Sequence, residues 1–492
     1  MHTMALRNAL IYDGSGSPPV EGDIALEADR IAAVGAVGAA RDNIDVAGQA
    51  VSPGFIDVHT HDDFAAVIYP DMAFKLGGGV TTCIVGNCGM GAAPFPQAAT
   101  LAKAIHPNKS LPDWGDYHGY LEQLDTHPPG VNIGVLVGHG TLRMAAMGRE
   151  KQEPSERQMS AMKSMLQEGL DAGALGLSTG LIYEPGKYAG TLELIELAQH
   201  MAGSGGVYAT HMRDEGSGLL YSIQEAIEIG ERAQVPVQIS HHKASGREAW
   251  GLVHQSLRLI ETAQADGLDI HADQYPYTAG STILSAVLAD DVSDMRNLAL
   301  ADIVIAATAE HPDWEGKSVP EVAKELGETP DAGARRILEL EPGATVILHS
   351  MNEEDVQTVM RHASTMIGSD GLPTLEGKPH PRLYGTFARV LGHYARDLNL
   401  FSLEEAIYRM TGFSARKFGL HGRGRIRENA FADLVVFDPA RIIDTGTFED
   451  PNHMPGGIER VFVNGVESVR AGQPLAQRAG RVLKRATRSP SP

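Results

Sequence analysis

Short apolar runs alternate with helical patterns through the middle of the chain, and this alternation is the strongest constraint on its fold. The helical patterns include residues 154–172, 191–202 and 219–233. Repeated βα units imply a parallel sheet, and eight runs fit a closed (β/α)8 barrel. The runs are GFIDVHTH (54–61), VTTCIVGNCG (80–89), VNIGVLVGHG (131–140), ALGLSTG (174–180), GVYATHMRD (206–214), VPVQISHHK (235–243), LDIHADQYPY (268–277) and STMIGSD (364–370).

The residues at the ends of these runs favour a barrel over other α/β folds. In a (β/α)8 barrel the carboxyl ends of the strands face one rim and carry the chemistry. Four of the eight runs end in His, Asp or Lys, and two more have Cys88 or His139 as the next-to-last residue. An open doubly wound sheet is the alternative, but we find no Gly-rich phosphate loop that opens a helix. The predicted fold class is α/β, with a TIM-like (β/α)8 barrel.

The two ends of the chain have a different sequence pattern. Short segments of alternating apolar and polar residues are separated there by turn signals such as Asp-Gly, Gly-Ser and Pro-Pro. We expect a small antiparallel sheet in which the two ends pair, giving a β-sandwich domain over residues 1–53 and 415–477. The alternating segments are 5–12, 23–34 and 44–52 at one end and 433–439 and 460–465 at the other.

The remaining stretches complete the predicted organisation. Residues 282–345 interrupt the barrel between the seventh and eighth runs and contain amphipathic patterns, which predicts an inserted subdomain. The barrel itself is predicted over 54–281 and 346–414. Residues 478–492 are basic and end in Pro and Ser, a pattern typical of a flexible, solvated tail.

Charge and cysteine content exclude several function classes. The chain has 41 Lys and Arg against 62 Asp and Glu, a net charge of −21 that repels nucleic acid and anionic membranes. Its 492 residues contain two cysteines, so it is no disulfide scaffold, and a reducing compartment is expected. The N-terminal residues lack a signal-peptide pattern, and no stretch approaches the ~20 apolar residues that span a bilayer. We predict a cytoplasmic protein.

Histidines at the ends of apolar runs indicate a metal site. His59 and His61 are two residues apart in a predicted strand, so both side chains leave the same face. His211 and His241 end two further runs. Each of the four could instead be a buried histidine with satisfied hydrogen bonds. Four imidazoles from three strands at one rim predict a metal site, with zinc favoured.

Residues near these histidines extend the predicted site. Asp62 and Asp63 follow His61 directly, and either could orient a histidine through its second ring nitrogen. Cys88 lies between small residues in GNCG, and its thiolate would be a good zinc ligand; an inert core cysteine is the alternative. Cys83 is expected to face the opposite side of its strand, toward the core.

A carboxylate and several donors follow other strands. Asp370 ends the last run, where a hydrolase that uses metal-bound water needs a carboxylate to move the proton. The alternative is a turn-forming Asp before a glycine. Clustered donors in an acidic chain suggest an anionic substrate group, most simply a carboxylate held by arginine, with ordinary surface ion pairing as the alternative. These donors are Lys243, Arg382, Tyr275, Tyr277 and Ser281.

A series of motifs covers most of the chain: GFIDVHTHDD, GNCG, THMRDEG, ISHHK, QYPYTAGST, GSDG and HPRLYGTFARVL. In this order they resemble the N-acyl-D-amino-acid deacylase (D-aminoacylase) family of the amidohydrolase superfamily. The opening strands and the closing ADLVVFDP also resemble the split β-sandwich of that superfamily. The HTH pair with a late Asp is typical of the superfamily, whereas GNCG, ISHHK and HPRLYGTF are typical of the subfamily.

This resemblance implies roles for the candidate residues. Cys88, His211 and His241 would hold zinc tightly, and His59 and His61 would form a second, weaker site that Cys88 can bridge. The fourth run lacks the lysine that many superfamily members carboxylate to bridge two metals. By the same resemblance, Asp370 is general base and acid, and the substrate α-carboxylate is held by Arg382, Lys243, Tyr275 and Ser281.

The resemblance also implies the reaction, zinc-dependent hydrolysis of an N-acyl-D-amino acid to a carboxylate and a free D-amino acid. The substrate would be a small molecule with a free carboxylate. One alternative is an amidohydrolase for cyclic amides or for dipeptides with a C-terminal D-residue, and another is a non-catalytic scaffold. Tyr183, Glu184 and Lys187 follow the fourth run and are candidates for side-chain selection. Side-chain preference, acyl preference and oligomeric state are left open.

Overall fold

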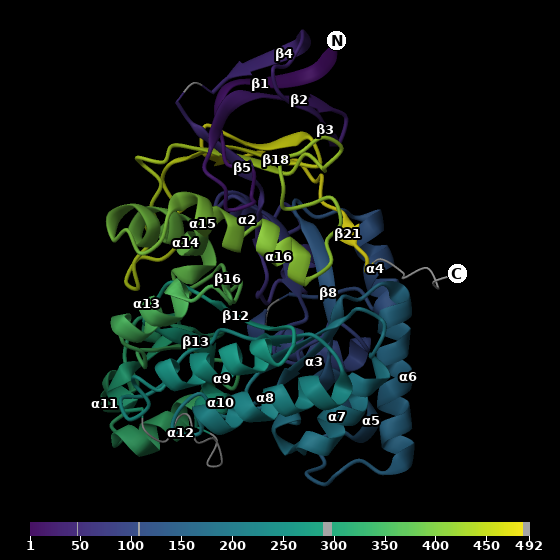
Figure 1. The fold of residues 1–492 in the computed structure, drawn as a ribbon. Helices are drawn as coiled ribbons and strands as arrows, with labels where there is room; N and C mark the ends of the chain where they lie inside the picture. Colours follow the sequence, from purple (N-terminus) through teal and green to yellow (C-terminus); the bar gives the residue numbers. More distant parts are fainter. Residues whose placement is uncertain (47, 107–108, 289–297, 486–492) are drawn as a thin grey trace.

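The structure is a computed structural model that describes residues 1–46, 48–106, 109–288 and 298–485. It contains a parallel eight-stranded barrel with a nine-stranded mixed sheet above it and a three-stranded sheet at one side (Figure 1). Within the described residues, no helix is long and apolar enough to cross a membrane.

Each of the eight predicted runs contains one strand of the barrel. The strands pair in the order β16-β12-β11-β10-β9-β8-β7-β6, all parallel. A parallel bridge between Thr60 and Gly371 links the two outer strands beyond their ends, so the barrel is nearly closed. The predicted (β/α)8 barrel is confirmed. Its strands are β6 (Phe55–Asp57), β7 (Val80–Val85), β8 (Asn132–Gly138), β9 (Gly176–Gly180), β10 (Val207–His211), β11 (Val237–Ile239), β12 (Ile270–Gln274) and β16 (Thr365–Ile367).

Helices surround the barrel, and four of them begin at a side-chain cap. In α6 (Glu156–Ala172), Ser155 and Gln158 form a capping box, and Gly173 ends the helix in a left-handed conformation. The apolar faces of these helices pack on the barrel as one large core. The other helices around the barrel are α1 (Ala65–Ile68), α2 (Ala73–Leu76), α3 (Phe95–Ile105), α4 (Tyr117–Thr126), α5 (His139–Met147), α7 (Thr191–His200), α8 (Leu219–Ala233), α9 (Val253–Ala265), α13 (Glu353–Arg361), α14 (Arg382–Arg389), α15 (Leu403–Arg409) and α16 (Gly412–Lys417).

The two chain ends share the nine-stranded sheet and one apolar core, as predicted, and lie together at the top of Figure 1. The sheet is mixed rather than antiparallel, because β1 runs parallel to both β4 and β5. Its strands are β1 (His2–Ile11), β2 (Val20–Glu27), β3 (Arg30–Gly35), β4 (Ala40–Asp45), β5 (Ala50–Pro53), β17 (Leu434–Phe437), β18 (Ile458–Val463), β19 (Val466–Arg470) and β20 (Gln473–Pro474).

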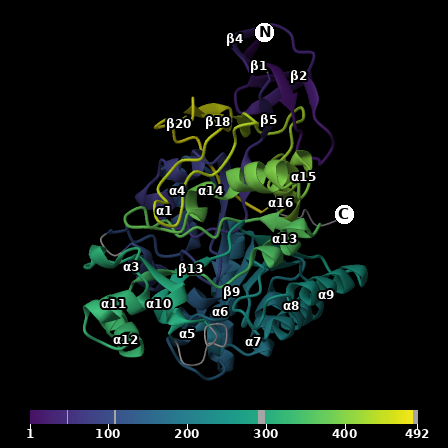
Figure 2. The ribbon, with the colours of Figure 1, turned by 90° about the vertical axis from the view of Figure 1, so that its left-hand side faces the viewer.

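The segment predicted as an insertion contains the third sheet, which has its own apolar core. This sheet pairs in the order β13-β15-β14 and extends from Gly280 to Leu348, slightly beyond the predicted 282–345. Figure 2 shows its helices beside α3 and α5. The exact domain boundaries stay a prediction. The elements are β13 (Gly280–Ile283), α10 (Leu284–Val287), β14 (Ile303–Ala307), α11 (Val319–Glu325), α12 (Pro330–Leu340) and β15 (Thr345–Leu348).

The predicted flexible tail is wrong for residues 478–485. Here β21 (Val482–Leu483) pairs with the first half of β8, next to the point where β9 takes over the pairing. Arg481 forms an ion pair with Asp29, and the guanidinium of Arg485 donates to the carbonyl oxygens of Ala174 and Leu170. Arg481 therefore anchors this segment to the turn between β2 and β3, and Arg485 anchors it to the barrel. Residues 486–492 lie outside the described part of the chain.

Candidate metal centre

Five potential metal ligands from four barrel strands meet at the carboxyl rim. His59 and His61 lie in the loop after β6, not in the strand as predicted, because β6 ends at Asp57. Cys88 and His241 lie just beyond β7 and β11, and His211 is the last residue of β10. All five side chains are buried, with exposures between 0 and 6 %. The barrel thus brings together the predicted ligands from distant parts of the sequence.

The Cys88 thiol lies at the centre of this cluster. Its Sγ is 3.3 Å from His59 Nε2, 3.7 Å from His211 Nδ1 and 3.6 Å from His241 Nε2. Burial alone would raise the pKa of the thiol, but the charge of His59 and the hydrogen bonds from the three imidazoles hold it well below its usual value. Cys88 is therefore held as a thiolate, the form that ligates metal ions.

Asp370 joins the cluster from the loop after β16. One oxygen, Oδ1, is 3.2 Å from His61 Nε2 and 3.4 Å from His59 Nε2, and Oδ2 is 2.9 Å from Arg382 Nη1. Burial opposes ionisation, yet the Arg382 guanidinium and the histidines keep the pKa of Asp370 well below its usual value. Burial likewise would lower the pKa of His61, but its contacts with Asp370 and Cys88 raise it to about 9.

Three of these residues have strained backbone conformations. The φ angles of Cys88, His241 and Asp370 are 53°, 35° and 51°, in the left-handed region that non-glycine residues rarely adopt. The two glycines of GNCG accommodate the turn around Cys88, because a Cβ at Gly86 would collide with the carbonyl oxygen of a neighbouring strand and one at Gly89 with the backbone of β9.

Two carboxylates that sequence reasoning missed orient the histidines. Glu215 Oε1 is 2.8 Å from His241 Nδ1, and Asp273 Oδ1 accepts a hydrogen bond from the His241 backbone and lies 3.5 Å from His59 Nδ1. Such contacts fix the orientation of a ligating imidazole and raise its basicity. Glu215 follows His211 by four residues in THMRDEG, and Asp273 is the next-to-last residue of β12 in the seventh run. Their positions at strand ends were the available signal.

Asp62 and Asp63 do not orient a histidine, contrary to the sequence-based expectation. Asp62 is 3.2 Å from Lys75 Nζ and accepts from the Thr60 hydroxyl. Asp63 is buried, which raises its pKa to about 7, and it accepts a backbone hydrogen bond from Gly86. Both carboxylates therefore stabilise the loops beneath the site.

Lys75 links the loops that carry the ligands. Its buried ammonium donates to Asp57, Thr60 and Ser369, and thereby connects the loop of His59 and His61 to the loop of Asp370. Cys83 is also fully buried here, and burial raises the pKa of its thiol. Cys83 belongs to the large apolar core and to none of the groups of potential metal ligands among the described residues, which agrees with the sequence interpretation.

Arg382 and Lys243 both lie near the ring of Tyr275, but their partners differ. Arg382 lies over the ring of Tyr275 with its guanidinium carbon 4.4 Å from the ring centroid, and it donates to the backbone carbonyl of Ser281 over 3.0 Å. The buried hydroxyl of Tyr275 makes no hydrogen bond to the described residues. Lys243, by contrast, pairs with Glu215 at 2.6 Å. Tyr277 lies apart from this group and donates to Asp444.

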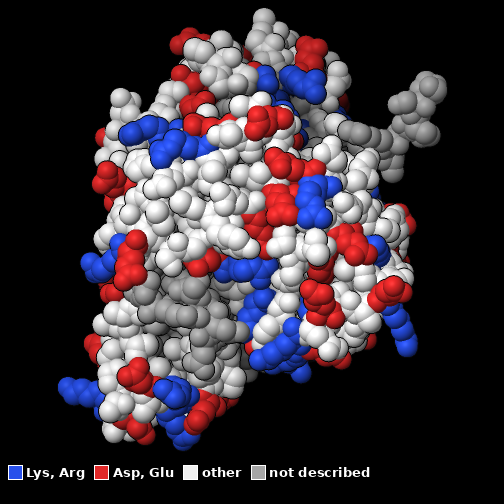
Figure 3. Space-filling model, turned by 60° about the horizontal axis from the view of Figure 1, so that its bottom comes forward, with Lys and Arg blue, Asp and Glu red and all other residues white. Residues whose placement is uncertain are grey.

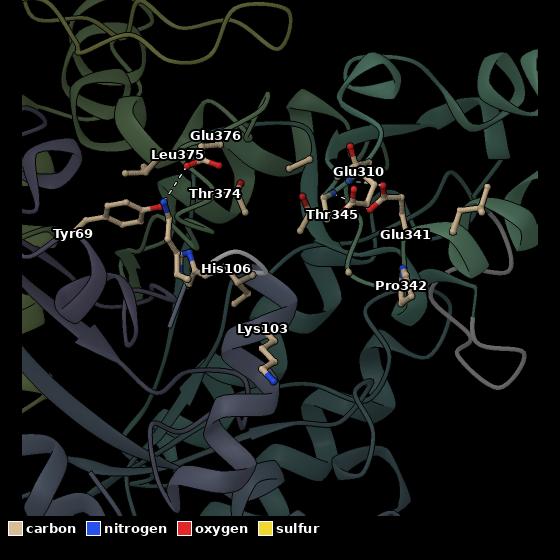
Figure 4. A pocket seen from close by; sticks show the side chains of 17 residues that line it. Tyr69, Lys103, His106, Glu310, Glu341, Pro342, Thr345, Thr374, Leu375 and Glu376 are labelled. Atoms are coloured by element: carbon tan, nitrogen blue, oxygen red, sulfur yellow. Dashed lines mark hydrogen bonds and ion pairs between the residues drawn. The ribbon is translucent and has the colours of Figure 1, made fainter. Parts of the chain in front are cut away.

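A cavity of about 540 Å³ opens beside the cluster, and Cys88 is part of its wall. The three loop residues singled out after the fourth run, Tyr183, Glu184 and Lys187, also line it. A second cavity of about 280 Å³ lies near the end of α3, between α3 and the inserted sheet (Figure 4). The ligand cluster does not contribute to the wall of this second cavity.

Comparison with known proteins places the chain in a family. The amidohydrolase family model matches residues 42–328 and 331–469. The chain is 43% identical over 490 residues to the D-aminoacylase of Alcaligenes xylosoxydans xylosoxydans, covering 98% of this chain and 97% of that one. A crystal structure of D-aminoacylase superposes with a TM-score of 0.89 at 42% identity, covering 99% of this chain and 100% of that one.

A further solved structure, N-acyl-D-glutamate deacylase from Bordetella bronchiseptica complexed with zinc and a phosphonate inhibitor, superposes with a TM-score of 0.89. The two chains are 38% identical, and the match covers 98% of this chain and 99% of that one. The match of the family model over most of the length, the agreement in fold and the identity to full-length relatives lead to one conclusion. This chain belongs to the amidohydrolase family.

Proposed function

We propose that this protein is a zinc-dependent hydrolase that cleaves the amide bond of N-acyl-D-amino acids and releases a carboxylate and a free D-amino acid. The observation that carries the proposal is the Cys88 thiol within 3.3–3.7 Å of three imidazole nitrogens, with Asp370 beside them. The relatives named D-aminoacylase and N-acyl-D-glutamate deacylase supply the substrate class, including its D-configuration.

The donor set fits zinc. Ligand bonds of about 2.3 Å to sulfur and 2.0–2.1 Å to nitrogen in a tetrahedral arrangement place the two donor atoms about 3.5 Å apart. The distances from Cys88 Sγ to His211 Nδ1 and His241 Nε2 are 3.7 and 3.6 Å. We assign the tight site to these three residues. A second, weaker site would use His59 and His61 with Cys88, whose donor atoms also lie within 4.8 Å of one another.

Bound zinc would polarise the amide carbonyl and lower the pKa of a water molecule. Asp370 is the carboxylate next to the donor cluster, so we assign it to accept the proton of the attacking water and to deliver it to the departing amine nitrogen. Its ion pair with Arg382 keeps it ionised and ready to accept that proton.

The α-carboxylate of the substrate would bind on the Arg382 side of the cluster. The buried guanidinium and the unpartnered Tyr275 hydroxyl supply a cation and a donor there, and the inserted β13 brings Ser281 next to Arg382. Lys243, which is paired with Glu215, would add its positive charge to this region. The surface supports an anionic substrate as well, because basic side chains gather along a hollow in the middle of the face shown in Figure 3, although the whole chain is acidic.

The proposal is tested by hydrolysis of paired N-acetyl-D- and N-acetyl-L-amino acids (Met, Leu, Phe, Glu and Asp), with zinc content measured on the same preparation. We expect turnover confined to the D-series in a zinc-containing protein. Zinc-containing protein that is inert toward both series would refute the substrate assignment, and activity on cyclic amides or on dipeptides with a C-terminal D-residue would replace it.

A further inference from the structure

The cavity beside the metal centre is built mainly from apolar side chains. Its wall is formed by α3, α5, the loop after β9 and the inserted helices α10 and α12. Its volume of about 540 Å³ falls in the range of roughly 300–1,000 Å³ that encloses drug-sized ligands, whereas the methyl of an acetyl group is a single carbon. The apolar residues in its wall include Met90, Leu101, Met144, Ile283, Leu288 and Leu338.

Several polar side chains in this wall have partners within the protein, and Gln97, Arg149 and Ser285 also line it. The Tyr183 hydroxyl is 3.0 Å from the Thr282 hydroxyl, and Lys187 lies 3.1 Å from Glu184. Thr141 accepts a hydrogen bond from the backbone of Gly91. A substrate group that enters the cavity therefore meets a wall that is mainly apolar and in which several polar side chains are already paired, which favours an apolar occupant.

The position of the cavity decides which end of the substrate enters it. Cys88 lies in the wall, while Arg382, Tyr275 and Lys243 do not. In a trans amide, the group on the carbonyl carbon and the group on the nitrogen point in opposite directions. If the scissile carbonyl lies at the donor cluster and the α-carboxylate lies toward Arg382, the acyl group extends to the Cys88 side.

We propose that this cavity is the acyl-group site, and that the enzyme prefers apolar acyl chains longer than acetyl. The inference rests on the function proposed above and adds the acyl class to it. It assigns selection of the acyl group to the inserted helices α10 and α12, because Leu288 directly follows α10 and Leu338 lies in α12, and both line the cavity with the loop after the fourth strand.

The test compares N-acetyl, N-butyryl and N-hexanoyl derivatives of the D-amino acid that the zinc-loaded full chain hydrolyses best. Burial of each methylene should raise kcat/KM about fourfold. We therefore expect kcat/KM to rise from acetyl to butyryl to hexanoyl by about this factor for each added methylene, until the cavity is filled. Hydrolysis of the acetyl compound with no gain for the longer chains overturns the acyl assignment and leaves the proposed function standing. No hydrolysis of any derivative overturns both.

Two leucines of one helix provide a variant and its control. Leu338 and Leu340 are both half-buried on α12, but Leu338 lines the cavity beside Cys88 and Leu340 lines the second cavity, shown in Figure 4. Leu338→Asn should lower kcat/KM for the hexanoyl substrate by about tenfold and change the acetyl value less than twofold. Leu340→Asn should leave kcat/KM unchanged for both the hexanoyl and the acetyl substrate.

A second substrate series separates the acyl group from the amino-acid side chain. N-acetyl-D-alanine and N-acetyl-D-norleucine differ by three methylenes on the amine side of the amide. We expect Leu338→Asn to leave the ratio of their kcat/KM values unchanged within twofold. If Leu338→Asn instead reduces the preference for norleucine and leaves the acyl series unaffected, the cavity holds the amino-acid side chain and the inference is wrong.

Discussion

Replacement of Glu215 by Gln should weaken zinc binding although Glu215 is not among the proposed ligands. Its Oε1 lies 2.8 Å from His241 Nδ1, and both carboxylate oxygens lie 2.6 Å from Lys243 Nζ. Loss of such a carboxylate contact to a ligating imidazole typically lowers metal affinity about 10- to 100-fold, which is about 1.4–2.7 kcal/mol. We expect the zinc Kd of Glu215→Gln to rise within this range.

The same substitution should also destabilise the fold, since it leaves the ammonium of Lys243 buried without its counter-charge. Removal of one partner of a buried ion pair costs about 3–5 kcal/mol. The double variant Glu215→Gln/Lys243→Met removes the unpaired charge and should recover most of that stability. It should not recover zinc affinity, because His241 still lacks its carboxylate partner. The two effects are thereby separated.

Zinc Kd is measured by competition with a chromophoric chelator, and stability by denaturant unfolding of the zinc-free protein. Glu225→Gln is a matched control: Glu225 is 5% exposed, as Glu215 is, and pairs with Arg213 away from the ligand cluster. The control should lose stability and keep zinc affinity. A Glu215→Gln protein that binds zinc within twofold of the parent would show that the contact to His241 has no role in the site.

Three further predictions concern other parts of the molecule. Asp370→Asn should lower kcat by about 10²- to 10⁴-fold, the usual contribution of a general acid-base group, with zinc content unchanged; near-parental kcat would refute its assignment. Lys75→Met should lower the free energy of unfolding by about 3–5 kcal/mol, since it leaves Asp57 and Asp62 buried without their cation, and a loss below 1 kcal/mol in denaturant unfolding would contradict this. Burial and the charge of a nearby lysine lower the pKa of His106 to about 4. The unfolded chain therefore binds a proton at His106 more readily than the folded chain does. The contribution of neutral His106 to the free energy of unfolding is fully present above pH 6.5, and about 3 kcal/mol of it is lost as the pH falls to 4. His106→Phe should remove this part of the pH dependence of stability. The check is the free energy of unfolding of variant and parent at pH 7 and at pH 4.5, and the same change with pH in both proteins would refute the prediction.

The barrel could be predicted because parallel strands buried on both faces read as continuous apolar runs. The ligands could be predicted because barrel topology brings strand ends to one rim, whatever their separation in sequence. The prediction that His59 and His61 share a strand was wrong because Asp57, where β6 ends, is bonded to Lys75 and Ser369. The two imidazoles still meet, with ring centroids 5.7 Å apart.

Other features depend on contacts that no local pattern encodes. Glu215 and Asp273 act on histidines from other segments, and the aspartates next to His61 in sequence are held by Lys75 and the backbone instead. The C-terminal segment is a similar case. Its arginines look like those of a solvated tail, but they bond to Asp29 and to backbone carbonyls of the barrel. In each case the contacts in the folded structure, and not the neighbouring residues in the sequence, determine the role of the side chain.

The left-handed conformations of Cys88, His241 and Asp370 have a consequence for how such a chain can evolve. A glycine adopts this region freely, whereas each side chain there costs about 1 kcal/mol or more. Drift under selection for stability alone would favour glycine at these positions and erase the site while the barrel persisted. Selection for catalysis opposes that drift, so libraries screened only for thermal tolerance should enrich folded, inactive descendants of this protein.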